Sequence, residues 1–154
     1  MPFEKVSTTL ENLESALAGE SMAHIKYRYF AKIAREEGYE EIAKHFEHTA
    51  DQEILHAWGH LELLIGKPST RECLEKAIEG ETYEFTTMYP KFEEQARSEN
   101  NRTAQYEFAN QIAESSDHAD QFKSVLAKAE KRFFALKKVE ERHANAYKKV
   151  METL

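Results

Sequence analysis

The sequence predicts an all-α protein, and three observations predict it. The 154 residues contain only three prolines and five glycines, so few positions interrupt a helix. Apolar residues recur at spacings of three and four, as they do along one face of a helix. No segment alternates apolar and polar residues as a half-buried strand does. The length is that of one domain, which we expect to span residues 1–154.

Start and stop signals predict a first helical hairpin over about 8–66. Thr8-Thr-Leu-Glu11 fits a capping box at the start of the first helix, and Gly38 is its expected end. The second helix is expected to end at Gly66-Lys67-Pro68, because this glycine and proline pair breaks helices.

A second hairpin is predicted over about 70–126. Ser69-Thr-Arg-Glu72 is another capping box, and Pro90 is expected to bend the helix locally. A turn is expected within 98–102, where Ser98-Glu-Asn-Asn-Arg102 interrupts the apolar pattern.

The remaining residues predict an additional C-terminal helix over about 128–154. Residues 103–154 contain neither glycine nor proline, so no residue marks a stop. An unbroken helix of that length would span about 75 Å. We therefore expect one break, near Ser124.

The two predicted hairpins resemble each other in sequence. Ser115 is the exception, because it stands where Glu53 would predict a glutamate. The pattern predicts a duplicated hairpin and a pseudo-twofold site between the halves. The matching segments, at offsets of 61 and 62, are Gly19-Glu20-Ser21 with Gly80-Glu81-Thr82, Phe46 with Phe108, and His56-Ala57 with His118-Ala119.

Composition and charge exclude several classes of function. A net charge of −7 argues against a nucleic-acid partner, which needs a basic surface. The single cysteine, Cys73, excludes a disulfide framework and a four-cysteine metal site, and a free thiol suits a reducing compartment. The sequence shows neither a signal peptide nor a membrane span. We therefore expect a soluble, cytoplasmic protein.

Carboxylates and imidazoles occupy positions where the apolar seams should continue. Glu53-Ile-Leu-His56 and Glu140-Glu-Arg-His143 are both Glu-x-x-His, which places each pair on one face of a helix. An unpaired buried carboxylate is very costly, so several together indicate bound cations. The candidate ligands are Glu20, Glu53, His56, Glu81, Glu84, Glu140 and His143.

The ligand types narrow the choice of metal. Carboxylates with two imidazoles form a hard-to-borderline set, unlike the cysteine-rich sites of structural zinc. One ion cannot use so many donor atoms, whereas two ions can. Helical bundles with this set, one glutamate from each of two helices and Glu-x-x-His from the other two, hold paired iron or manganese ions. The ligand types therefore predict two metal ions, either iron or manganese.

Four segments resemble the rubrerythrin family: Leu17–His24, Arg35–Tyr39, Ala50–Ala57 and Ile78–Glu84 followed by Met88-Tyr-Pro90. The resemblance covers about residues 8–98 and the C-terminal tail. It implies a ferritin-like four-helix bundle with a di-iron centre that reduces hydrogen peroxide to water in oxidative-stress defence. It also implies that Glu20, Glu53, His56, Glu81 and Glu84 are ligands. Tyr27 and Tyr89 would be the tyrosines that hydrogen-bond ligand carboxylates.

The chain departs from the family's pattern in two respects. It lacks the rubredoxin domain that usually follows, so we expect electrons from an external protein such as a rubredoxin or ferredoxin. We also expect a homodimer. The fourth-helix motif is also displaced. Counted without gaps it falls on Ser115 and His118, and a complete motif follows only at Glu140 and His143. We favour this later pair.

An alternative for the fourth helix is Glu114 with His118, brought into register by a π-bulge. Three other functions also remain open. They are ferritin-like iron storage, an O₂-using di-iron oxidase, and a structural bundle whose glutamates pair with lysine and arginine.

Overall fold

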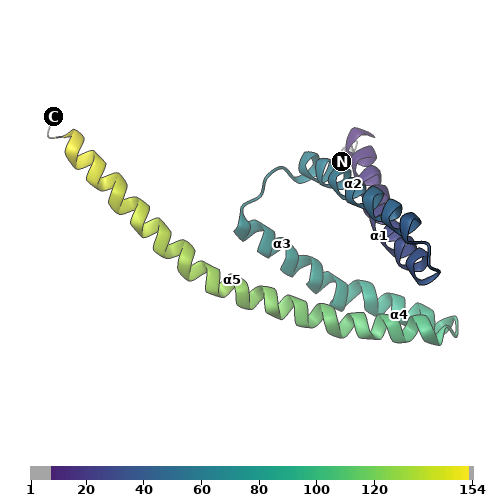
Figure 1. Ribbon diagram of the computed structural model, residues 1–154. Coiled ribbons are helices and arrows are strands. Elements are labelled where there is room, and N and C mark those ends of the chain that lie inside the picture. Colours follow the sequence, from purple (N-terminus) through teal and green to yellow (C-terminus); the bar gives the residue numbers. More distant parts are fainter. Residues whose placement is uncertain (1–7, 153–154) are drawn as a thin grey trace. The chain divides into compact units, whose positions relative to one another are not determined.

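The computed structural model describes residues 8–152, in two compact units that meet in the sequence at Lys67 and Pro68. Every regular element among the described residues is a helix, which confirms the all-α class (Figure 1). None of these helices is long and apolar enough to cross a membrane. The prediction that residues 1–154 form a single domain stays a prediction.

The first unit is an antiparallel hairpin of α1 (Thr8–Glu36) and α2 (Glu40–Ile65). Ala43, Ala50 and Ala57, spaced seven residues apart on α2, are all buried. Residues at this spacing lie on one face, and their small side chains let the two helices approach closely. The predicted cap at Thr8 stays a prediction, because Thr8 is the first described residue and already helical.

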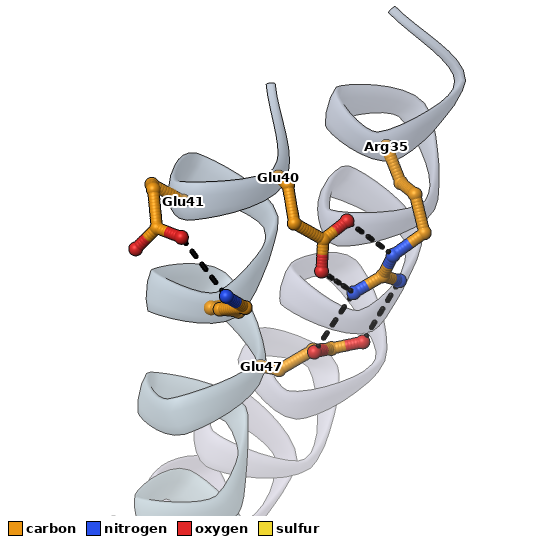
Figure 2. A network of polar contacts seen from close by, with 5 residues as sticks. Arg35, Glu40, Glu41 and Glu47 are labelled. Carbon is orange, nitrogen blue, oxygen red and sulfur yellow. Dashed lines mark hydrogen bonds and ion pairs between the residues drawn. The ribbon is translucent and has the colours of Figure 1, made fainter. Parts of the chain in front are cut away.

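Arg35 joins the two helices of this hairpin at the turn. Its guanidinium donates to Glu40 at 3.0 and 3.3 Å and to Glu47 at 3.0 and 3.1 Å (Figure 2). The hydrogen bond from Arg35 lowers the pKa of Glu47, although burial acts against it. These groups are exposed, so the network fixes the geometry of the turn more than it stabilises the fold.

The second unit pairs one interrupted helical run with one very long helix. The run consists of α3 (Thr70–Tyr83), the π-helix η1 (Glu84–Met88) and α4 (Tyr89–Ser98). The predicted capping box is confirmed, because the Glu72 amide donates to the Ser69 hydroxyl and the Glu72 carboxylate accepts from the Ser69 amide. All three elements pack against the long helix α5 (Arg102–Met151).

The expected break near Ser124 is wrong, and so is a separate helix over 128–154. α5 runs without interruption for 50 residues and is drawn as a single helix in Figure 1. No residue in it forces a stop, and extending a helix costs less than nucleating another. Arg71, near the start of α3, contacts Glu130 at 3.1 Å, and every described residue from there to Glu152 is exposed.

The two hairpins repeat each other in detail. Each turns on a residue with positive φ, Gly38 at 86° and Asn100 at 58°, which are 62 positions apart. Each also encloses three aromatic rings at the same offset, with centroids between 5.6 and 6.3 Å apart. The triplets are Tyr27, Phe30 and Phe46, and Tyr89, Phe92 and Phe108.

The π-helix accounts for the change of offset within this repeat. Glu20 matches Glu81 at an offset of 61, whereas Tyr27 matches Tyr89 at 62, so one residue is added between them. The Tyr89 amide bonds the Glu84 carbonyl, which is the π spacing that accommodates such an insertion. Pro90 follows directly and has no amide hydrogen to donate. The π-bulge considered for the fourth helix near Glu114 is wrong, because α5 is α-helical there.

The two turns provide a matched test of backbone strain. A Cβ at Gly38 would meet no atom within 4 Å, so Gly38→Ala acts only through its positive φ. We expect it to lower the free energy of unfolding by about 1 kcal/mol. Asn100→Gly should leave stability within about 0.5 kcal/mol of the wild type, because glycine adopts this conformation freely. Urea unfolding followed by circular dichroism measures both, and an unchanged Gly38→Ala variant would contradict the argument.

Candidate metal centre

Three of the predicted ligands meet on the first hairpin, where Glu20 and Glu53 are partly buried and His56 is exposed. α1 supplies Glu20, and α2 supplies Glu53 and His56 one helical turn apart. One ligand atom from each lies within 4.8 Å of the others. The Nδ1 atom of His56 is 3.2 Å from Glu53 and 3.9 Å from Glu20. This is a group of two oxygen ligands and one nitrogen ligand that converge on one point.

The carboxyl group of Glu20 is influenced by its neighbour Glu53. A hydrogen bond with Glu53 raises the pKa of Glu20, and partial burial and the charge of Glu53 act in the same direction. A cation beside the pair would offset the repulsion between the two negative charges. The side chains therefore fit a divalent or trivalent ion.

His24 does not belong to this group of ligand atoms. Its Nδ1 atom lies 2.7 Å from the backbone carbonyl oxygen of Ala50. A carbonyl only accepts hydrogen bonds, so this nitrogen carries the proton and donates it. His24 therefore joins α1 to α2 through this hydrogen bond.

The second hairpin has a looser group from α3, η1 and α5, whose ligand atoms do not come as close together as those of the first hairpin. The Nδ1 atom of His118 lies 3.4 Å from Oε2 of Glu81. The hydroxyl of Ser115 donates to Oε2 of Glu84 at 2.9 Å. As in the first hairpin, a glutamate of one helix faces a histidine of the next.

One oxygen of this second group lacks a partner. Oε2 of Glu81 is shielded from solvent and accepts no hydrogen bond among the described residues. His118 is close enough for an ion pair but is poorly aligned for a hydrogen bond. A buried carboxylate oxygen in this state is unfavourable unless something neutralises it. The surroundings of this oxygen fit a position beside a bound cation.

Glu140 and His143, the pair favoured from the sequence, do not join the ligand group of the second hairpin. Glu140 and His143 are exposed on the part of α5 that lies beyond the contact between Arg71 and Glu130. The structure brings His118 to Glu81 instead. The sequence did not predict the contact between Ser115 and Glu84. The signal that could have found it is the offset of 62, which makes Ser115 the counterpart of the ligand candidate Glu53.

The two predicted tyrosines occupy equivalent places, each at the centre of its hairpin's aromatic cluster. Burial raises the pKa of Tyr89, and the charges of Glu84 and Glu81 raise it further. Tyr89 therefore lies near the acidic group of its hairpin and keeps its phenolic proton. Its hydroxyl remains a hydrogen-bond donor over a wide pH range.

Replacing Glu20 tests the electrostatic strain of the metal-free chain. Because its pKa is raised in the folded state, the native protein binds this proton more tightly than the unfolded chain does. Stability should therefore fall as pH rises from the ordinary glutamate range through the raised pKa. Glu20→Gln should remove that loss, whereas Glu14→Gln, on an exposed part of α1, should retain it. Urea unfolding between pH 4 and pH 8, in the presence of a chelator, measures the free energy of unfolding of each variant. Parallel pH profiles for wild type and Glu20→Gln would refute the prediction.

Comparison with known proteins identifies related chains. Nigerythrin from Nitratidesulfovibrio vulgaris is 40% identical over 131 residues, covering 76% of this chain and 65% of nigerythrin. Rubrerythrin from Porphyromonas gingivalis is 37% identical, covering 82% of this chain and 70% of that protein. The chain thus spans about two thirds of the length of these relatives. A solved structure of fully reduced, all-ferrous nigerythrin is 36% identical, covering 83% of this chain and 70% of that one, with a TM-score of 0.41.

The rubrerythrin family model matches residues 11–126. That segment contains the candidate ligands of both hairpins, together with Ser115, and ends before Glu140 and His143. The match covers most of the chain, and the relatives above 30% identity agree with it. The predicted ferritin-like class is confirmed with it, and the chain belongs to the rubrerythrin family.

Proposed function

We propose that this chain is a non-haem di-iron peroxidase that reduces hydrogen peroxide to water with electrons from another protein. The observation that carries the proposal is the repeated pairing of a glutamate on one helix with a histidine on the next. It occurs between Glu20 and His56 and again between Glu81 and His118. Rubrerythrin family proteins bind a di-iron centre, and both groups have the hard-to-borderline ligands that iron takes.

The proposed ligands are four carboxylates and two imidazoles. Their four negative charges match the four positive charges of two ferrous ions, which supports a divalent pair over a single ion. Compared with the sequence-based set, His118 replaces His143, and Glu140 is left out. The set is Glu20, Glu53, His56, Glu81, Glu84 and His118.

The chemistry divides between the ions and the chain. Two ferrous ions held by these residues would supply the two electrons that the reduction of peroxide requires. The chain holds the ligands at fixed positions, balances charge, and delivers the two protons that the products require. Overall, one peroxide, two protons and two electrons give two molecules of water.

Tyr89 is the proposed proton-holding group of the second hairpin. Its raised pKa keeps the phenol protonated beside Glu84 and Glu81. The hydroxyl can therefore donate a hydrogen bond to a ligand carboxylate or to a departing oxygen. Tyr27 is proposed for the equivalent place in the first hairpin, because the two aromatic clusters repeat each other.

An external redox protein, such as a rubredoxin or ferredoxin, is the proposed electron donor. The 154 residues contain one cysteine, Cys73, which is exposed, so they cannot form a four-cysteine iron site. We also propose a homodimer that works in the cytoplasm. The free thiol and the net charge of −7 support an intracellular protein without a nucleic-acid partner.

Two histidines of α5 provide a matched test of the ligand set. His118→Ala should lower iron binding at least 10-fold, because it removes a ligand nitrogen beside Glu81. His143→Ala, on the exposed part of the same helix, should bind iron as the wild type does. Elemental analysis after anaerobic loading measures both. The opposite ranking would restore Glu140 and His143 as the ligand pair.

The reaction itself is tested by rapid mixing. Chain loaded with two equivalents of ferrous iron should be oxidised by one equivalent of peroxide at least 10 times faster than by air-saturated buffer. Stopped-flow absorbance measures the two rates, and Glu53→Ala serves as the variant with an incomplete ligand set. Oxidation that is faster with air than with peroxide would favour an oxidase or a storage protein instead.

A further inference from the structure

The two hairpins have different sources for their second carboxylate. In the first hairpin it is Glu53, on the second helix, one turn before His56. The equivalent position in the second hairpin is Ser115, one turn before His118. A simple copy of the first hairpin would therefore have one carboxylate fewer here.

Glu84 is an acidic residue without a counterpart in the first hairpin. At offsets of 61 and 62 it corresponds to Ala23 and Met22, neither of which has a carboxylate. It is also the residue at which the π-helix begins. The inserted residue and the additional carboxylate therefore occur at the same place in the chain.

Ser115 and Glu84 are in direct contact. Ser115 is only 3% exposed, and its hydroxyl donates to Oε2 of Glu84 at 2.9 Å. A serine leaves room for this arrangement, whereas a glutamate at the same position would press a second carboxylate against Glu84. The short side chain and the donated hydrogen bond both suit a neighbouring carboxylate.

We propose that Ser115 is a positioning residue, which holds Glu84 so that the second hairpin still offers two carboxylates and one imidazole. Glu84, supplied by the π-helix, then takes over the part that Glu53 plays in the first hairpin. The inference rests on the proposed function, because it concerns ligands of the same metal centre. It adds a role for a residue that binds no metal itself.

The first test removes the hydroxyl. Ser115→Ala should weaken the binding of the second metal ion by 10- to 100-fold, as loss of a hydrogen bond to a ligand carboxylate does. Ser115→Thr, which keeps a hydroxyl, should recover most of the affinity. Ser116→Ala, at the adjacent and partly exposed serine, should bind as the wild type does. The probe is Co²⁺, titrated into the metal-free full-length chain and followed by its visible absorption.

The second test moves the carboxylate. Glu84→Ala should bind one ion fewer than the wild type. The double variant Glu84→Ala/Ser115→Glu should bind that ion again, because residue 115 then carries a carboxylate at the position that corresponds to Glu53 in the first hairpin. Circular dichroism checks that each variant folds. A double variant that folds without regaining the ion, or a Ser115→Ala variant with wild-type affinity, overturns the inference.

The outcome for the wild type separates this inference from the proposed function. A wild-type chain that binds less than about half an equivalent of Co²⁺ or iron contradicts the di-iron assignment, and the inference with it. A wild-type chain that binds two ions, with Glu84→Ala also binding two, contradicts the inference alone.

Discussion

The structure depends on holding carboxylates close together between paired helices. The hydrogen bond and charge of Glu53 raise the pKa of Glu20, and an oxygen of Glu81 is buried without a hydrogen bond. Such positions are unfavourable for the chain alone and become favourable when a cation is bound. The alanines of α2 serve this arrangement, because they bring the helices close enough for side chains from both to meet.

Duplication supplies the scaffold, and small departures from it supply the chemistry. The turns at Gly38 and Asn100 and the two aromatic triplets repeat at one offset. The candidate ligands do not repeat in this way. Ser115 of α5 stands at the position that corresponds to Glu53, and the π-helix provides Glu84, which has no counterpart in the first hairpin. One inserted residue shifts every later side chain by about 100° on a straight α-helix. A π turn absorbs that shift locally, so the aromatic cluster beyond it keeps its place.

The fourth-helix pair shows where reasoning from periodicity stops. Glu140 and His143 interrupt an apolar stripe, and a stripe indicates a buried face only where a second helix covers it. Within its own hairpin, α5 is covered by α3 only as far as the contact of Arg71 with Glu130. His118 stands on the covered part, beside a glutamate that would otherwise have no partner.

The sequence alone determined the all-α class, the capping box at Ser69, the turn near Asn100 and the duplication, because caps, breakers and spacing act within a few residues. Tertiary structure decided the continuity of α5, the place of the π-helix and the contact of Ser115 with Glu84. These depend on which residues face each other across a hairpin. Spacing along one helix gives the face of each side chain, whereas only the packed pair gives its neighbour.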